Sequence, residues 1–312
     1  MKVLMISNDP KILEKGSAVY ARVAEYGKKF EELHTLFISG RSFSKSPFAA
    51  VIAGTKIMRE RGFGPDDLIT VQDPFLTASV GVALKKKFGS SLEIQIHTDI
   101  GSPYYARESF TNRIRLWSAR KNLPKSDHVR AVSERIRKFL VSSDGLKIPY
   151  DKIEIRPIFV DTERIKKSLV TLDLHKKYPQ FGKIILMASR LTREKDFPTA
   201  FKAFAKVLEK FTDTGLVVVG SGPEKLKKVK NVVLENWVDQ ETLFSYYKTA
   251  DIFLSTSLYE GYGMSMVEAR AAGCPIVATD AGIAPEIAAR VCPVGDAECL
   301  AVGIVDVLSK KQ

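Results

Sequence analysis

Short runs of β-branched and apolar residues alternate with longer segments of helical periodicity along nearly the whole chain. This order is typical of βαβ units, which fold into parallel sheets covered by helices. Helical patterns such as residues 17–30 and 75–88 separate the predicted strands of the first half. Those strands are residues 3–6, 35–39, 68–71, 93–97, 128–132 and 152–160. A second series gives strands at residues 184–188, 216–219, 232–234, 252–255 and 275–278.

The two series are separated by a charged and weakly periodic stretch, residues 162–182. A chain of 312 residues commonly forms two domains. We therefore predict an α/β fold with two Rossmann-like domains, residues 1–164 and 165–312. Ligands of such sheets bind at the carboxyl ends of the strands. The cleft between the two domains is the expected site.

The longest stretch without Asp, Glu, Lys or Arg is residues 74–84, eleven residues. A membrane-spanning helix needs about 20, so no spanning segment is expected. The three cysteines, Cys274, Cys292 and Cys299, lack metal-ligand spacing. We interpret them as core residues of a protein in a reducing cytoplasm.

The net charge of +12 is unevenly distributed. Residues 1–160 carry 27 basic and 17 acidic side chains, a balance of +10, whereas residues 161–312 carry 21 and 19, a balance of +2. Ten basic and three acidic residues fall within residues 107–138, interleaved with Phe110 and Trp117. This segment is either a solvated helix face or a surface for an anionic membrane, where the protein would bind peripherally at the inner face. No motif supports a nucleic-acid partner.

Two loops of the second half carry residues suited to anions. Ser189 to Lys195 follows the first strand of that half, and Arg190 and Lys195 in this loop can neutralise a diphosphate. Residues 219–223, Val-Gly-Ser-Gly-Pro, form a glycine turn after a strand. We interpret this turn mainly as a tight connection.

The most informative segment is residues 260–275, between two predicted strands. Gly261 and Gly263 allow close approach of a ligand to the backbone, and a helix starting near Tyr262 would offer free N–H groups to an anion at Gly263 and Met264. Glu268 would then lie about 9 Å along that helix from its start. Carboxylates accept hydrogen bonds from paired hydroxyls, so Glu260 and Glu268 fit a sugar and a ribose, although Glu268 could instead serve a buried structural network.

These motifs resemble the retaining GT-B glycosyltransferases of glycosyltransferase family 4. The resemblance covers about residues 184–286 and includes Ser-Arg-Leu-x-x-Glu-Lys, Val-Gly-Ser-Gly-Pro, the two glutamates Glu260 and Glu268, and the turn from Asp280 to Glu286. It implies a C-terminal domain that binds a nucleotide sugar of UDP or GDP type and an N-terminal domain that binds a glycan, glycolipid or other acceptor.

The resemblance also implies residue roles. Arg190 and Lys195 would bind the donor diphosphate, Glu260 would face the transferred sugar, and Glu268 would hold the ribose. Backbone groups after Trp237 and Val238 would contact the base. In the first half, Gly16 and Ser17 match the loop that approaches the phosphate, with serine in place of a second glycine. His97 matches a histidine near the reacting sugar, where a structural role is the alternative.

Two further departures from the family concern the junction and the end of the chain. Ile158-Phe159 replaces the common Asn-Gly of the domain junction, and no counterpart of the family's terminal crossing helix follows Leu308. The resemblance implies transfer with retention, without a metal or other cofactor beyond the nucleotide sugar as co-substrate. The alternatives are a non-catalytic nucleotide-sugar-binding subunit and a nucleotide-sugar epimerase of the same fold.

Overall fold

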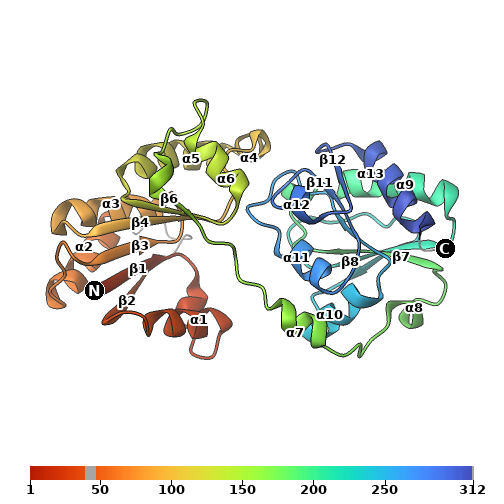
Figure 1. Cartoon of the computed structure of the whole chain (residues 1–312), viewed down its shortest axis with the longest axis horizontal. Helices are drawn as coiled ribbons and strands as arrows, with labels where there is room; N and C mark the ends of the chain where they lie inside the picture. The colour runs from red at the N-terminus through yellow and green to blue at the C-terminus, as the bar shows by residue number, and fades with distance from the viewer. Residues whose placement is uncertain (39–46, 311–312) are drawn as a thin grey trace. The chain divides into compact units, whose positions relative to one another are not determined.

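The computed structural model describes residues 1–38 and 47–310. The chain divides into two compact units, Met1–Pro157 and Ile158–Gln312, each built around a six-stranded sheet (Figure 1). All recorded strand pairings are parallel, which confirms the predicted α/β class. The domain boundary predicted from the sequence follows residue 164. Helix α7, Thr162–Lys167, contacts helix α11, Met264–Ala271, and so belongs with the second unit.

The N-terminal sheet has the strand order β2-β1-β3-β4-β5-β6. In Figure 1, helices α3 and α5 lie on one side of this sheet and α1 on the other. The strands are β1 Lys2–Ser7, β2 Glu32–Phe37, β3 Leu68–Val71, β4 Ser91–Ile96, β5 His128–Ala131 and β6 Ile153–Ile155. The helices are η1 Pro10–Leu13, α1 Ala18–Gly27, α2 Pro47–Glu60, α3 Leu76–Phe88, α4 Pro103–Glu108, α5 Phe110–Asn122, η2 Leu123–Lys125, α6 Glu134–Val141 and η3 Tyr150–Lys152.

The C-terminal sheet has the strand order β12-β11-β10-β7-β8-β9. Its strands are β7 Lys183–Ala188, β8 Thr214–Val219, β9 Val232–Glu235, β10 Ile252–Ser255, β11 Ile276–Thr279 and β12 Arg290–Cys292. Besides α7 and α11, its helices are α8 Leu174–Lys177, η4 Arg193–Lys195, α9 Phe197–Lys210, α10 Gln240–Thr249, α12 Ala284–Ile287 and α13 Ala297–Ser309.

The structure corrects three details of the predicted strands. The strand predicted at residues 152–160 ends at Ile155, because Pro157 has no N–H to continue the ladder. The strand predicted at residues 35–39 is β2, and Ser39 lies outside the described residues. Strand β12 was not predicted, because this edge strand of three residues is too short to show a period.

Apolar side chains cover both faces of the C-terminal sheet. Alternate residues of a strand point to opposite faces. Ile184, Leu186 and Ala188 of β7 join one buried cluster, whereas Ile185 and Met187 join another. Such burial on both faces is the usual condition of a parallel sheet.

The N-terminal sheet has faces of different character around β4. Leu92, Ile94 and Ile96 alternate with Glu93 and Gln95, and all five side chains are buried. One face of this strand is therefore apolar and the other polar.

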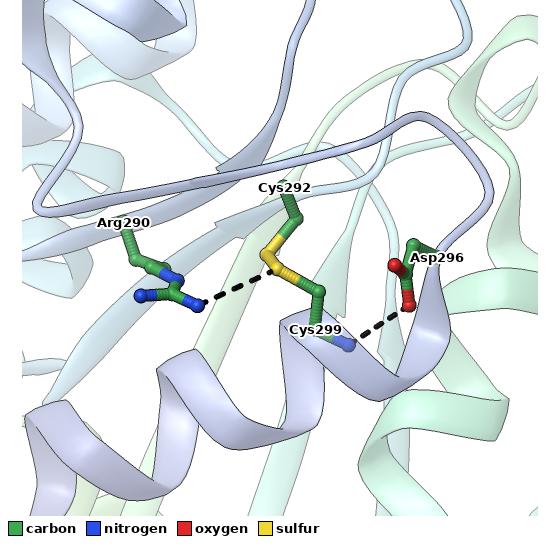
Figure 2. The surroundings of a disulfide bond; sticks show 4 residues. All are labelled: Arg290, Cys292, Asp296 and Cys299. Carbon is green, nitrogen blue, oxygen red and sulfur yellow. Dashed lines mark hydrogen bonds between the residues drawn. A yellow bond between two sulfur atoms is a disulfide. The ribbon is translucent and has the colours of Figure 1, made fainter.

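The structure contains a disulfide, which corrects the interpretation of the cysteines. Cys292 on β12 is bonded to Cys299 on α13 (Figure 2). Arg290 Nη2 lies 3.9 Å from the Cys299 sulfur, and the Cys299 N–H donates to Asp296 at the start of the helix. The disulfide removes the cysteine-based argument for a reducing compartment. Cys274 is a buried thiol, as predicted.

Within the described ranges, no helix combines the length and the apolar character needed to cross a membrane.

Candidate functional site

The candidate site begins where two neighbouring strands of the C-terminal sheet end. Strands β7 and β10 pair in parallel, so the loops that follow them emerge at the same edge. The Thr256 hydroxyl donates to the carbonyl of Lys195 at 2.7 Å, and the Leu258 N–H donates to the carbonyl of Glu194 at 2.7 Å. These bonds hold the loop that carries Lys195 against the loop that carries Glu260.

Lys195 and Glu260 form an ion pair at the centre of this edge. Their side chains are only 14% and 18% exposed. The Ser257 hydroxyl donates to Oε1 of Glu260 at 2.9 Å, the same oxygen that Lys195 contacts. The lining of a small pocket includes these three residues together with Ser189 and Ser265. The structure thus brings together two residues that the sequence analysis proposed separately.

Arg190 lies in the same loop but is much more open to solvent. Its side chain is 72% exposed, and its nearest acidic partner is Glu194 at 3.3 Å. Solvent weakens such a pair, so Arg190 can reorient toward an anion at little cost. Among the described residues, its recorded ion pair is with Glu194 and not with Glu260.

The glycine turn after β8 packs against the Arg190 loop. A Cβ atom on Gly220 would lie 1.9 Å from the carbonyl oxygen of Ser189, and one on Gly222 would lie 2.2 Å from that of Leu191. Backbone bonds also join the loops, because the Leu191 N–H donates to Ser221 O at 3.0 Å. The turn is therefore the tight connection that the sequence favoured.

The glycine loop after Glu260 leads into α11, which begins at Met264 rather than at the predicted Tyr262. Gly263 has φ of 102°, a left-handed conformation that other residues rarely adopt, and this residue is the N-cap of the helix. It supplies no side chain to accept hydrogen bonds from the first turn. Upstream of it, Tyr262 O accepts from the Ile283 N–H at 3.0 Å, which ties the loop containing Gly261 to the Asp280–Glu286 turn.

Glu268 lies in the second turn of α11, deeper in the unit. The hydroxyl of Tyr247, a fully buried residue of α10, donates to Oε2 of Glu268 at 3.0 Å. Burial raises the pKa of Glu268, and the Tyr247 hydrogen bond partly offsets this by lowering it. The carboxyl group is thus fixed in orientation by one partner.

Trp237 and Val238 follow β9 at the same end of the sheet. Trp237 is 48% exposed, and its ring lies 3.6 Å from the position of a Cβ on Gly220. Val238 packs on the apolar cluster beneath. Trp237 thus lies beside the glycine turn.

The remaining predicted residues lie in the N-terminal unit. Gly16 has φ of 94°, and Ser17 caps α1 by accepting from the Tyr20 N–H at 3.0 Å. His97 follows β4, and its Nε2 lies 3.2 Å from Oε1 of Gln95. Gly16, Ser17 and His97 all belong to the unit Met1–Pro157.

Sequence reasoning missed the residues that support this site. Ser257 stands three positions before Glu260 and could have been noticed as its nearest serine or threonine. Tyr247 lies 21 positions from Glu268, and its place in an amphipathic helix resembles that of any core residue. No group of three or more His, Cys, Asp or Glu side chains suited to a metal occurs in residues 1–38 and 47–310.

Two αβ units of this kind, each built around a six-stranded parallel sheet, define the GT-B fold class. Two family models match the chain: Glycosyltransferase Family 4 over residues 14–164 and Glycosyl transferases group 1 over residues 182–310. The chain belongs to the group 1 and family 4 glycosyltransferases.

Curated relatives match part of the chain. N-acetyl-alpha-D-glucosaminyl L-malate synthase of Bacillus anthracis is 28% identical over 207 residues, which are 62% of this chain and 53% of that protein. Phosphatidyl-myo-inositol mannosyltransferase of Mycolicibacterium smegmatis is 28% identical over 195 residues, 58% of this chain and 48% of that protein. The matched part of this chain thus spans about half the length of these relatives.

Among solved structures, sucrose-phosphate synthase of Thermosynechococcus elongatus superposes with a TM-score of 0.76 at 19% identity. The superposition covers 99% of this chain and 90% of that one. At this identity the likeness concerns the fold.

Proposed function

We propose that this chain transfers a sugar from a nucleoside diphosphate donor to a hydroxyl group of an acceptor, with retention of the anomeric configuration. One observation carries the proposal. Lys195, Glu260 and the start of α11 converge at the carboxyl edge of the C-terminal sheet, and Glu268 lies one turn further along the helix. A cation, an uncapped helix start and two carboxylates in this order match a diphosphate flanked by two sugars.

Each residue has a defined part in this proposal. Arg190 and Lys195 bind the diphosphate, together with backbone N–H groups of Gly16 and of Gly263 and Met264. Glu260 and His97 contact the transferred sugar, and Glu268 accepts from the ribose hydroxyls. Trp237 and Val238 border the base. The donor base is of the uridine or guanosine type.

The reaction proceeds by charge stabilisation. The bond between C1 of the sugar and the diphosphate oxygen breaks, and Lys195 and Arg190 stabilise the departing negative charge. The acceptor oxygen forms its bond to C1 from the same face, and its proton passes to the released diphosphate oxygen. No step of this proposal requires a metal. The Ser257 hydroxyl keeps Glu260 oriented when Lys195 turns to the diphosphate.

A thermal-shift screen against uridine, guanosine and adenosine diphosphates and their common sugars tests the donor site. A ligand at about 100 times its dissociation constant adds about 2.7 kcal/mol of stability. We expect a shift with one base, which Glu268→Ala and Arg190→Ala abolish.

Arg193→Ala is the matched control for Arg190→Ala, because Arg193 is an equally exposed arginine of the same loop that pairs with Glu224. It should leave the shift intact. Release of the nucleoside diphosphate with an acceptor would then test turnover. Binding without turnover across acceptor classes would favour the non-catalytic subunit, and no shift with any nucleotide would contradict the donor site.

For the acceptor side, we propose that α5 docks on an anionic membrane. Phe110, Ile114 and Trp117 are 74%, 51% and 62% exposed, and their spacing places them along one stripe of the helix. Arg113 is adjacent in sequence, and Lys121 Nζ lies 5.9 Å from the Trp117 ring. Apolar wedges beside basic side chains are what an interfacial helix needs, and the relative from Mycolicibacterium smegmatis is named for a lipid acceptor.

Co-sedimentation with vesicles at low salt tests this docking. We expect binding to phosphatidylglycerol vesicles, little binding to phosphatidylcholine vesicles, and loss of binding in the double variant Phe110→Ser, Trp117→Ser. Phe48→Ser is the control, because Phe48 is 71% exposed on α2, outside the stripe. Equal loss in the control, or no binding by the wild type, would contradict docking through α5.

A further inference from the structure

The polar face of the N-terminal sheet carries a buried group of side chains that the proposed reaction does not use. Thr70, Glu93 and Gln95 are 0%, 7% and 5% exposed. The parallel register sets Thr70 of β3 beside Glu93 of β4, and Gln95 beside Arg130 of β5. Because polar groups are costly to bury without partners, their hydrogen bonds define how this face is organised.

The hydrogen bonds form a chain that ends at His97. The Thr70 hydroxyl donates to Oε1 of Glu93 at 2.7 Å. The Gln95 amide nitrogen donates to Oγ1 of Thr70 at 2.9 Å and lies 3.4 Å from the same Glu93 oxygen. At the other end of the amide, Oε1 of Gln95 lies 3.2 Å from Nε2 of His97.

The direction of this chain follows from its first member. A carboxylate only accepts hydrogen bonds, so the single hydroxyl hydrogen of Thr70 is used on Glu93. The Thr70 oxygen can then only accept from Gln95. Both neighbours of the Gln95 amide on this side are acceptors, so its NH₂ must face them and its oxygen must face His97.

We infer that Glu93, Thr70 and Gln95 act together as positioning residues that hold His97 in the tautomer with hydrogen on Nε2. The Gln95 oxygen accepts, so the ring nitrogen beside it has to donate. In a neutral imidazole the lone pair then belongs to Nδ1. His97 thereby presents an acceptor nitrogen.

The electrostatics of the ring agree with a neutral imidazole. Although part of His97 reaches solvent, the surrounding protein atoms lower its pKa below 6.5, and the nearby Arg130 guanidinium lowers it further. At neutral pH the ring is uncharged, so the tautomer decides which nitrogen accepts. The buried carboxylate of Glu93 thus acts on His97 through two intervening side chains.

The functional consequence rests on the proposed glycosyl transfer. A sugar hydroxyl beside His97 can donate to Nδ1 only while that nitrogen carries a lone pair. A ring in the other tautomer would offer a donor at the same point. Loss of one oriented hydrogen bond would lower kcat about tenfold while leaving donor KM nearly unchanged.

Nitrogen NMR of the full chain labelled with ¹⁵N-histidine tests the tautomer directly. The chain has four histidines, and His97→Asn identifies the signals of His97. At about pH 8, where an imidazole is neutral, we expect protonated Nε2 and unprotonated Nδ1. Protonated Nδ1 in the wild type would overturn the inference.

Variants of Gln95 test whether the chain sets this state. Gln95→Met is similar in length but cannot accept strongly, and Gln95→Leu is a second version should the first fail to fold. We expect a mixture of tautomers in either, and a return to protonated Nε2 in Gln95→Glu, whose carboxylate accepts. Gln72→Leu removes another amide, which Ser7 contacts at 2.5 Å, and should leave His97 unchanged.

An unchanged tautomer in Gln95→Met and Gln95→Leu would show that the hydrogen-bond chain does not set the tautomer of His97, and would overturn the inference. If the tautomer responds as expected but the wild type transfers no sugar, the proposed function fails and the assignment of His97 stands. If transfer occurs and kcat is insensitive to Gln95, the tautomer has no part in the reaction.

Discussion

The two sheets of this protein differ in what their faces contain. The C-terminal sheet packs apolar side chains on both faces, and the candidate site residues stand in the loops at its carboxyl edge. On the N-terminal sheet, one face of β4 is apolar while the other holds Glu93 and Gln95 beneath His97. Two six-stranded parallel sheets thus support functional residues in different ways.

The difference shows how a parallel sheet can orient a site. In the C-terminal unit, an apolar core fixes the strand ends, and loop hydrogen bonds from Thr256 and Ser257 set the orientation of Lys195 and Glu260. In the N-terminal unit, the strand itself carries the orienting groups. Truncation of an apolar strand residue should therefore affect mainly stability in the first case, whereas loss of Gln95 should affect mainly His97.

The largest expected effect is a loss of stability in the C-terminal sheet. Leu186 of β7 is fully buried in the centre of the C-terminal unit. Leu186→Ala should lower the free energy of unfolding by about 2–5 kcal/mol, since the truncation leaves a cavity. Urea unfolding measures this. Leu169→Ala is the control, because Leu169 is 80% exposed, and it should change stability little. A loss below about 1 kcal/mol for Leu186→Ala would mean that the core there is loosely packed.

The second effect concerns an edge of the same sheet. The disulfide joins β12 to α13 and closes a segment of only a few residues, with a sequence separation of 7. Restricting the unfolded chain in this way adds about 2–3 kcal/mol. Reduction should lower the unfolding midpoint of the C-terminal unit and leave the N-terminal unit unchanged, since every cysteine lies beyond residue 273.

Calorimetry with and without reductant measures this difference, and the double variant Cys292→Ser, Cys299→Ser should unfold alike under both conditions. If reductant lowers the midpoint of the double variant as well, the effect has another source than this disulfide.

The sequence predicted this architecture well because its signals are local. Alternating strands and helices, and the Arg190, Lys195, Glu260 and Glu268 motifs, lie within short windows. The contacts that organise the site are not local. The pairing of Lys195 with Glu260 spans 65 positions, and that of Tyr247 with Glu268 spans 21. The polar pattern of β4 was visible as Glu-Ile-Gln-Ile-His, but its link to Thr70 required the strand register.

The smallest effect concerns the Tyr247 hydroxyl, a buried group that orients Glu268 of the C-terminal site as Gln95 orients His97. Burial raises the pKa of Glu268 above 4.5, and the Tyr247 bond lowers it. The ionised carboxylate is the better acceptor for ribose hydroxyls. The affinity for the donor should therefore have its full value at a pH above this raised pKa, where Glu268 is ionised. It should decline as the pH falls through the pKa.

Tyr247→Phe removes the lowering contribution, so the decline should begin at higher pH, and affinity at neutral pH should fall up to about tenfold. Calorimetric titration of the donor across pH measures both. Tyr246→Phe is the matched control, because the neighbouring Tyr246 hydroxyl donates to Glu235 instead. If both variants shift the pH profile alike, or neither does, Tyr247 does not tune Glu268.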